Sequence, residues 1–511
     1  MKPSPGSPTR RRFVAGATAS IAISRARGAD SDADLIKAME AVQKAIPLAS
    51  ADPDRPIYHF HPPAQWNNDP NGTLYYKGWH HLFYQLDPFG ANPGSQHWGH
   101  ARSKDLVNWE HLPIAIWPSP EKGERAIFSG GAIIADDGRP RLIYTSIGHP
   151  QPEQWMVIPE DDDLISWKKF AGNPVLTAAA HSSLTVNQWR DPFLFREGGQ
   201  VYMVCGGNAS SGRGGAGQVQ LYRAVKNDLS EWKHLGAVFQ ALERETYNIE
   251  CPNLFKLDGK WVLIISPHRP CEYYVGSLDI DKVKFTPETH GILDAGAAYA
   301  SNISHDDRNR TILWLWGRTN TPPGRGWNGV MTLPRILSIG ADGFLRQEVP
   351  SEFRALRGDA RTFPGVQLGE NPLPLDGVSD TSEIEAEFSA GNFSTFGFEV
   401  RRAGKPALIV AIDRGTLTVG NAKAYVENAE RYRLRLFFDK RCLEVYVNDG
   451  AVALYSFIDA PPGDQGLAVF ARRVNPGLGI PASRPPARVR MESLKAWPMK
   501  PAVFSLEQFH V

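Results

Sequence analysis

Several features that would assign a protein to a particular class are scarce in this chain of 511 residues. Cysteine occurs four times, at Cys205, Cys251, Cys271 and Cys442, without the CxxC spacing of a zinc site, so free thiols and up to two disulfides remain as alternatives. Charge of one sign is not in excess, because 56 basic residues face 55 acidic ones, and we expect no nucleic-acid partner and no anionic membrane partner. No DxDxDG calcium loop occurs, and we expect neither a metal ion nor a cofactor.

Long hydrophobic runs are also missing. Beyond the N-terminus no segment approaches about 18 unbroken apolar residues, so we expect a mature protein that does not enter a membrane. The N-terminal stretch "TRRRFVAGATASIAISRARGAD" has a basic cluster, a short apolar run and then small residues, which is typical of a secretory signal. Its start, "TRRRFV", resembles the twin-arginine signal for proteins exported after folding. We therefore predict a twin-arginine-type signal peptide at residues 1–29 and a periplasmic or extracellular location, with a basic disordered tail as the less favoured alternative.

What the chain has in quantity is glycine, proline and tryptophan, at 47, 40 and 14 residues. Abundant glycine and proline favour short strands and turns over helical bundles. The pattern Asp-Leu-x-x-Trp occurs three times, starting at Asp105, Asp163 and Asp228. Three copies at similar intervals indicate a repeated structural unit.

Five further segments each read as strand, polar turn, strand. They are "GTLYYKGWHHLFYQ", "GGAIIADDGRPRLIYTSI", "PFLFREGGQVYMVCGG", "PNLFKLDGKWVLIISP" and "SNISHDDRNRTILWLWG". Their turns carry hairpin signals such as Lys-Gly and Asp-Gly. The five units predict a five-bladed β-propeller over residues 55–345.

The flanking segments complete an all-β prediction. Residues 30–54 contain one amphipathic helix and a lead-in, because apolar residues repeat there at helical spacing: Leu35, Ile36, Met39, Val42 and Ile46. Residues 346–376 are irregular and rich in Pro and Gly, which predicts a linker. Residues 377–511 hold strands of period two, such as "RYRLRLFFD" and "CLEVYVNDG", and predict a C-terminal β-sandwich.

Acidic residues recur at nearly the same place in successive units. Counted back from each hairpin turn, the first four units place Asp69, Ser129, Asp191 and Glu250 just before the first strand. Equivalent positions of a propeller surround one end of its axis, so three carboxyl groups should meet there. Clustered carboxylates repel one another, and such a cluster indicates a function. Turn caps would explain one or two of these residues, and a metal site would need more oxygen ligands; we favour a catalytic site.

Seven blocks resemble, in order, the signatures of the family-32 glycoside hydrolases, which include invertases, levanases, inulinases and related fructosyltransferases. The blocks are "WNNDPNG", "HLFYQLDPFG", "HWGHARSKDLVNWEHLP", "FSGGAII", "WRDP", "ECPNLF" and "DKRCLEVYVNDG". The resemblance implies a five-bladed propeller followed by a β-sandwich, and cleavage of β-fructofuranosyl bonds with retention of configuration. It implies that Asp69 is the nucleophile, that Glu250 is the acid/base, and that Asp191 holds the fructose hydroxyls and stabilises the transition state.

The same resemblance supplies a set of pocket residues and two departures. The residues that match substrate-binding positions are Trp66, Asn68, Gln85, Trp98, Phe128, Ser129, Arg190 and Trp316. The first block of the family commonly reads Trp-Met-Asn-Asp, whereas this chain has Asn67 in place of Met. The family usually shows a Gly-Trp pair near the fifth blade, where this chain reads "WLWG". In the last block, the structural interpretation is favoured for Asp439 and Glu444.

Elementary chemistry of the carboxyl groups agrees with these roles. A glycosidase needs one ionised carboxylate and one protonated carboxylic acid at the scissile bond. We expect burial and nearby negative charge to raise the pKa of Glu250, and we expect Arg190 to keep Asp191 ionised. The expected partner is a small or polymeric fructoside. Transfer of the fructosyl group to another sugar and non-catalytic fructan binding are the alternatives, and the choice among sucrose, inulin and levan stays open, as does the oligomeric state.

Overall fold

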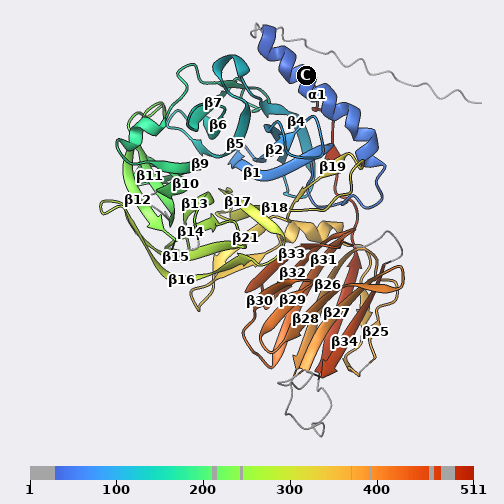
Figure 1. Ribbon diagram of the computed structural model, residues 1–511. Coiled ribbons are helices and arrows are strands. Elements are labelled where there is room, and N and C mark those ends of the chain that lie inside the picture. Colours follow the sequence, from blue (N-terminus) through green and yellow to red (C-terminus); the bar gives the residue numbers. More distant parts are fainter. Residues whose placement is uncertain are drawn as a thin grey trace, which may run out of the picture.

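The computed structural model describes residues 29–209, 216–241, 246–369, 371–390, 394–459, 465–473 and 489–510. The predicted signal peptide therefore lies outside the described residues, except for its last position. The described part of the chain begins with α1 (Ala29–Ser50) and is otherwise nearly all β, with three short 3₁₀ helices (Figure 1). Within the described ranges no helix combines the length and the apolar character needed to cross a bilayer.

Helix α1 lies along the outside of the first sheet (Figure 1). It buries Leu35, Met39 and Val42, and the Met39 sulfur accepts a hydrogen bond of 3.4 Å from the backbone N–H of Ile114. Ile36, which the sequence pattern placed on the same stripe, is 41 % exposed. A step of one residue turns the helix by about 100°, which takes Ile36 off the buried face.

Five antiparallel sheets follow in chain order. Their main strands are β1 (Gln65–Tyr76), β2 (Trp79–Asp87), β3 (His97–Ser103) and β4 (Trp109–Ile116); β5 (Ala126–Ile134), β6 (Pro140–Ile147), β7 (Glu153–Pro159) and β8 (Trp167–Lys169); β9 (Val186–Glu197), β10 (Gln200–Ala209), β11 (Ala216–Ala224) and β12 (Trp232–Gln240); β13 (Glu250–Leu257), β14 (Lys260–Ser266), β15 (Cys271–Asp279) and β16 (Lys284–Asp294); and β17 (Ala298–His305), β18 (Thr311–Gly317), β20 (Val330–Met331), β21 (Arg335–Ile339) and β22 (Leu345–Glu348).

The first strands of these sheets lie side by side around a common centre. Strand β1 contacts β5, β5 contacts β9, β9 contacts β13, β13 contacts β17, and β17 contacts β1 again. The sheets fan outward from this ring, as Figure 1 shows. Large apolar side chains fill the space between neighbouring sheets, for example Phe195, Trp261 and Tyr202 between the third and the fourth.

Two short parallel strands enlarge the first sheet. Strand β19 (Trp327–Asn328) pairs with β1, and β36 (Phe504–Ser505) pairs with β4. The C-terminal residues predicted to belong to the sandwich thus return to the first sheet. A side-chain hydrogen bond of 3.2 Å from Gln43 to the carbonyl of Phe509 ties the same segment to α1.

The Asp-Leu-x-x-Trp repeat marks the start of an outer strand in three sheets. Trp109, Trp167 and Trp232 are buried and begin β4, β8 and β12. The leucine of each copy has a positive φ, between 57° and 65°. The three copies therefore form the same type of tight turn. After each turn the tryptophan begins the next strand and packs into the adjoining core.

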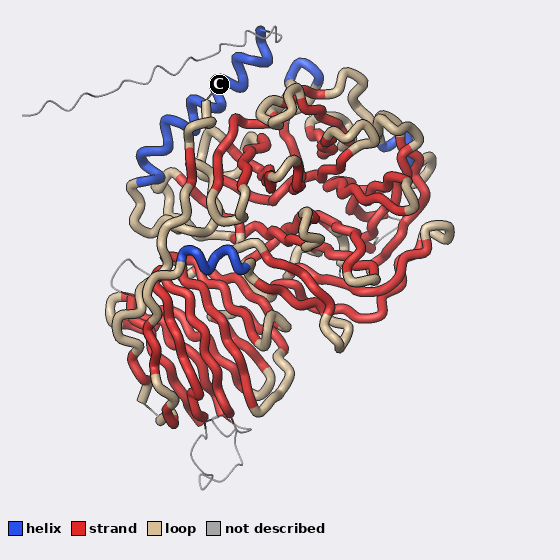
Figure 2. Tube along the Cα trace, turned by 180° about the vertical axis from the view of Figure 1, so that it is seen from behind, coloured by secondary structure: helices blue, strands red, loops and turns tan. Residues whose placement is uncertain are grey.

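Two packed sheets form the C-terminal part of the chain (Figure 2). One contains β23 (Arg361–Phe363), β24 (Val366–Gln367), β26 (Thr381–Ala390), β31 (Arg431–Asp439), β32 (Cys442–Val447), β33 (Val452–Phe457) and β35 (Val489–Pro498); the other contains β25 (Leu373–Pro374), β27 (Ser394–Arg402), β28 (Lys405–Asp413), β29 (Thr416–Val419), β30 (Ala422–Tyr425) and β34 (Gln465–Arg473). A continuous apolar core fills the space between them. The segment expected as an irregular linker is partly regular. It contains η3 (Ser351–Leu356), the strands β23 and β24 of the first sandwich sheet, and the strand β25 of the second.

A fully buried charge network connects the ring of sheets to the sandwich. His59 Nδ1 lies 2.9 Å from Asp439 Oδ2, and His59 Nε2 lies 3.3 Å from Glu444 Oε1. Arg335 lies 2.8 Å from Asp294 and 3.1 Å from Glu444. Asp439 and Glu444 thus hold the two parts together, which is the structural interpretation favoured from the sequence.

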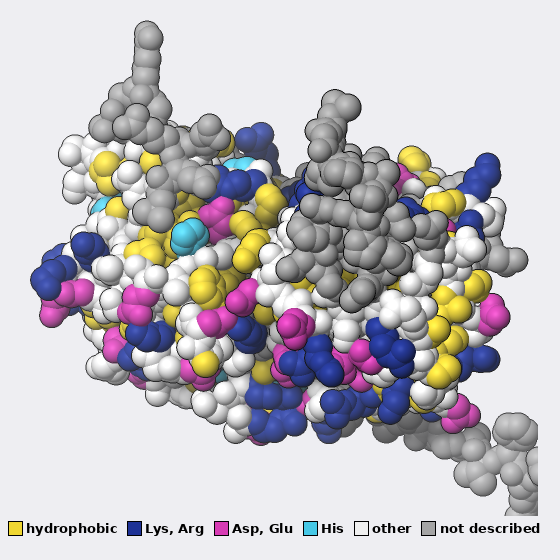
Figure 3. Space-filling view, turned by 90° about the horizontal axis from the view of Figure 1, so that it is seen from below, with side chains coloured by type: hydrophobic (Ala, Val, Ile, Leu, Met, Phe, Trp, Pro, Cys, Tyr) yellow, Lys and Arg dark blue, Asp and Glu magenta, His cyan; other side chains and the backbone are white. Residues whose placement is uncertain are grey.

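The structure describes all four cysteines and, in Figure 3, the charges on one face of the molecule. All four cysteines are free and buried, so the disulfide alternative is wrong. On the face shown in Figure 3, basic and acidic side chains are interspersed rather than gathered into a field of one sign.

Candidate active site

The innermost strand of each of the first four sheets carries a β-bulge at a corresponding position along the strand. In each, two residues oppose a single residue of the second strand: 68–69 opposite Gln85, 128–129 opposite Thr145, 191–192 opposite Cys205, and 251–252 opposite Ile265. The fifth sheet has one extra residue, Ala300, at the corresponding place. A bulge bends its strand and turns a side chain away from the regular alternation, which is why bulges occur beside functional sites.

These bulges correct one expectation from the sequence. Asp69 lies within strand β1 and not just before it, since β1 begins at Gln65. The four residues occupy neighbouring positions, which agrees with the expectation of nearly the same place in each unit. Asp69 and Ser129 are second in their bulges, Asp191 is first, and Glu250 immediately precedes its bulge.

Asp69 is buried against a chain of hydroxyl and amide donors. The Ser129 hydroxyl donates a hydrogen bond of 2.5 Å to Asp69 Oδ2, and Gln85 Nε2 donates one of 2.9 Å to that hydroxyl. The Cys251 thiol lies 3.5 Å from the same carboxylate oxygen. Burial raises the pKa of Asp69 to about 6, and the charge of Glu250 adds to this effect, while the hydrogen bond from Ser129 opposes it.

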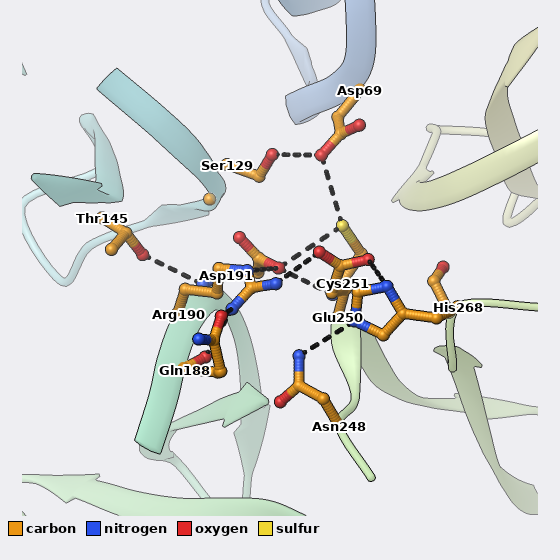
Figure 4. A network of polar contacts seen from close by, with 12 residues as sticks. Asp69, Ser129, Thr145, Gln188, Arg190, Asp191, Asn248, Glu250, Cys251 and His268 are labelled. Atoms are coloured by element: carbon orange, nitrogen blue, oxygen red, sulfur yellow. Dashed lines mark hydrogen bonds and ion pairs between the residues drawn. The ribbon is translucent and has the colours of Figure 1, made fainter. Parts of the chain in front are cut away.

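Cys251 contacts the carboxylate groups of both Asp191 and Asp69. The backbone N–H of Cys251 donates a hydrogen bond of 3.0 Å to Asp191 Oδ2, and the Cys251 sulfur lies 3.7 Å from that oxygen (Figure 4). Burial raises the pKa of Asp191 to about 7, and the charges of Glu250 and Asp69 add to it, although Arg190 opposes the shift. Arg190, 3.7 Å away, lowers the pKa of Asp191 as the sequence suggested, but burial and like charge outweigh this effect, so the net shift is upward.

Glu250 is the partner that Arg190 holds more closely. Arg190 Nη2 donates to Glu250 Oε1, and the Tyr299 hydroxyl donates a hydrogen bond of 2.6 Å to Oε2. Burial alone would raise the pKa of Glu250, but Arg190 and Tyr299 outweigh burial and hold the pKa below its usual value. The expectation of a raised pKa is wrong for the ligand-free protein, because this ion pair could not be deduced from sequence.

Most of the other predicted pocket residues join this group. Trp98 Nε1 donates a hydrogen bond of 3.1 Å to the carbonyl of Phe128, which fixes the bulge that carries Ser129. The rings of Trp66 and Trp316 meet edge to face at 6.5 Å. Asn68 directly precedes Asp69 in the same bulge, and its side-chain oxygen makes no hydrogen bond within the described residues.

Further side chains at the site were missed from the sequence. Tyr299 precedes the bulge of the fifth sheet, as Glu250 does in the fourth, so the fifth repeat could have pointed to it. Arg318 covers the rings of both Tyr299 and Trp316, at 4.4 Å and 5.0 Å, and so joins the tryptophan pair to the carboxyl groups. His268 Nδ1 lies 3.5 Å from Glu250 Oε2, and no motif indicated it.

The donor set suits acid–base chemistry. The described residues contain no group of three or more His, Cys, Asp or Glu side chains arranged to hold a metal ion. Two raised carboxyl pKa values beside a lowered one are typical of a site that moves protons.

Comparison with known proteins identifies the family. The Glycosyl hydrolases family 32 N-terminal domain matches residues 59–348, and the Glycosyl hydrolases family 32 C terminal domain matches residues 352–497. The chain belongs to glycosyl hydrolase family 32. It is accordingly a glycoside hydrolase of the β-fructosidase type.

Relatives of this family-32 enzyme act on fructosides, as their names state. The chain is 31 % identical to a levanase of Bacillus subtilis in an alignment 485 positions long, which covers 82 % of this chain and 68 % of that protein. It is 29 % identical to a sucrose-6-phosphate hydrolase of the same organism, covering 85 % of this chain and 95 % of the relative. A Bombyx mori β-fructofuranosidase variant solved with sucrose superimposes with a TM-score of 0.74 at 26 % identity, over 93 % of this chain and 100 % of the other.

Proposed function

We propose that this enzyme hydrolyses β-fructofuranosyl bonds of sucrose or fructans through a covalent fructosyl-enzyme intermediate. The observation that carries the proposal is the meeting of Asp69, Asp191 and Glu250 around Cys251 in a chain of family 32. We further infer that the five sheets are the blades of a five-bladed β-propeller. Its axis would run through the ring of inner strands, with the carboxyl groups at one end.

In the first step Asp69 attacks the anomeric carbon of the fructosyl group. The bond from that carbon to the glycosidic oxygen breaks, and the oxygen takes the proton of the Glu250 carboxyl group. In the second step Glu250 removes a proton from water, and the water oxygen replaces Asp69 on the same carbon. Two displacements retain the configuration, and Asp191 holds the hydroxyls of the ring throughout.

The proton must lie on Glu250 when the first step begins. In the ligand-free protein Arg190 favours the ionised form of Glu250, while burial favours the protonated forms of Asp69 and Asp191. We infer that the bound fructosyl group draws Arg190 away from Glu250. Loss of that ion pair would raise the pKa of Glu250, and Asp69 could then be the ionised carboxylate.

Two variants separate the roles. Asp69→Asn keeps the shape of the side chain but removes the attacking charge, and turnover should fall by about three orders of magnitude or more. Glu250→Gln should impair natural fructosides strongly, because their leaving alcohols need a proton. An activated fructoside should still form the intermediate in Glu250→Gln, and azide, which needs no general base, should restore turnover as a fructosyl azide of retained configuration.

The control is the response of the other variant. Azide should not restore Asp69→Asn, since that variant forms no covalent intermediate. Rescue of Asp69→Asn and not of Glu250→Gln would show that the roles are exchanged. Normal turnover by both variants would exclude this site.

We also propose export through the twin-arginine-type signal at residues 1–29, on the basis of the basic cluster and the apolar run that follows it. Replacing Arg10 and Arg11 by Lys should leave the precursor inside the cell, as seen by immunoblotting of cell fractions. Unchanged export of the lysine variant would show a signal of another type.

A further inference from the structure

The Glu250 carboxyl group is contacted from two directions. Arg190 binds Oε1, while Tyr299 and His268 approach Oε2. In Figure 4 the imidazole of His268 lies beside Glu250, on the side away from Arg190 and Asp191. Arg190 and Tyr299 are largely buried, but the side chain of His268 is 42 % exposed. His268 therefore stands where the proposed acid/base meets the solvent.

The position of the imidazole is fixed by three contacts or constraints. Buried Asn248 lies with Nδ2 at 3.2 Å from His268 Nε2, and this contact orients the ring so that Nδ1 faces Glu250. The backbone N–H of His268 donates a hydrogen bond of 2.9 Å to the Tyr299 hydroxyl. The backbone of His268 is left-handed, with φ at 62°, which few residue types adopt readily.

Tyr247 extends this surface outward. Its ring stacks on the imidazole of His268, with 5.8 Å between the centroids and 26° between the planes. Tyr247 is 54 % exposed, and its carbonyl accepts a hydrogen bond from Asn208 Nδ2. We call Tyr247 and His268 together the outer ledge.

We propose that the outer ledge binds the sugar that leaves with the glycosidic oxygen, and so determines which fructosides the enzyme prefers. This inference rests on the proposed acid/base role of Glu250. A general acid gives its proton to the oxygen that joins the fructosyl group to its leaving group. The fructosyl group itself is expected beside Asp69 and Asp191. A fixed, exposed surface on the other side of Glu250 therefore faces the leaving sugar.

The chemistry of the ledge suits a sugar. A ring face packs against the C–H groups of a pyranose or furanose, and the phenol and imidazole can exchange hydrogen bonds with its hydroxyls. A role limited to supporting Glu250 would not require two half-exposed aromatic side chains. Buried Arg190 and Tyr299 already fill that role.

The test compares leaving groups that share one fructosyl donor. The substrates are sucrose, an inulin-type trisaccharide, a levan-type trisaccharide and β-fructofuranosyl fluoride, whose leaving atom is too small to touch the ledge. The variants are Tyr247→Ala and His268→Asn; asparagine tolerates the left-handed backbone and keeps an N–H donor near the position of Nδ1. Tyr425→Ala is the matched control, because Tyr425 is 76 % exposed on β30 of the sandwich.

In both ledge variants we expect kcat/KM to fall about tenfold for at least one of the three sugars. The order of preference among the three sugars should therefore change. Hydrolysis of fructosyl fluoride by Tyr247→Ala should stay within about twofold of the wild type, as should hydrolysis of every substrate by Tyr425→Ala. An equal loss on the fluoride and the sugars would overturn the proposal, because the ledge would then act through Glu250. Wild-type values for all substrates in both variants would also overturn it. A wild-type enzyme inactive on every fructoside would overturn the proposed function itself, which is a different result.

Discussion

The pKa of Asp69 is a balance between burial and one hydroxyl group. Burial raises it to about 6, and the hydrogen bond from Ser129 holds it down. Because Asp69 must be ionised to attack, kcat/KM should fall as the pH drops through that pKa. Ser129→Ala removes the opposing hydrogen bond, so the pKa of Asp69 should rise further, and the acid limb of the pH profile should move to higher pH by about one unit.

The measurement is kcat/KM on an activated fructoside across the pH range, with Ser277→Ala as the control. Ser277 is an exposed serine on β15, and its removal should leave the acid limb in place. A limb that moves to lower pH in Ser129→Ala would contradict the balance described above.

The sequence predicts which residues form the active site, but it does not predict which of their carboxyl groups are ionised. Asp69, Asp191 and Glu250 follow from the repeat and from the resemblance, and the structure brings them together. The pairing of Arg190 with Glu250 does not follow, because Arg190 adjoins Asp191 in sequence and reaches across to the next sheet in space. His268 lies in a loop between two ordinary strands, and no spacing rule connects it to Glu250.

Gly206 allows the third and fourth sheets to pack closely beside the residues that carry the carboxyl groups. It pairs with Arg190 across the third sheet, and a Cβ atom there would lie 2.1 Å from the carbonyl oxygen of Ile249. Gly206→Ala should therefore push away the backbone that carries Glu250. We expect a loss of about 1–3 kcal/mol in the free energy of unfolding.

The same variant should lower kcat/KM, because Glu250 moves with its backbone. Calorimetry and kinetics check the two effects. Gly369→Ala is the control, since a Cβ atom at Gly369 would meet no atom within 4 Å. A Gly206→Ala enzyme as stable and as active as the control would show that the sheets can separate at no cost.

Elements were predicted well where a local pattern specifies them. The hairpins follow from alternating apolar residues and turn residues, and β1–β2, β5–β6 and β9–β10 occur where those patterns lie. The bulges could not be predicted, because an extra residue in a strand is visible only against its partner strand. This is why the sequence pattern predicts Asp69 just before the first strand, whereas it lies within β1.

For the whole molecule, His59 links stability to pH at the contact between the ring and the sandwich. Burial by itself would lower the pKa of His59, but the hydrogen bond to Asp439 and the close contact with Glu444 raise it to about 9. The folded pKa exceeds the ordinary value of 6.5, so protonated His59 contributes its full stabilisation below about pH 6.5. That contribution should be lost as the pH rises through about 9.

Removing the imidazole should expose this dependence. His59→Gln should lower stability by about 3 kcal/mol near neutral pH, since it leaves the buried Asp439 without its cationic partner, whereas Glu444 keeps Arg335. The difference in Tm between wild type and variant should shrink from about pH 7 to about pH 10. His290→Gln, at an exposed histidine of β16, is the control, and a difference that stays constant over this range would contradict the assignment.

Contacts between the two parts were the least predictable feature of the chain. "DKRCLEVYVNDG" was recognised as a block, but its partners His59 and Arg335 belong to segments with no pattern of their own. The return of β36 to the first sheet was equally hidden, because two residues of strand give no period.

The pairing of β36 with β4 has a consequence for synthesis on the ribosome. The Val503 backbone N–H donates to Asn108 Oδ1, and the two residues are 395 positions apart. When the strands that carry Asp69 leave the ribosomal exit tunnel, the edge strand of their sheet has not yet been translated. The sandwich strands must be translated first, and only then can residues 503–505 dock on β4. The sheet that carries Asp69 is therefore completed only after the strands of every other sheet have been translated.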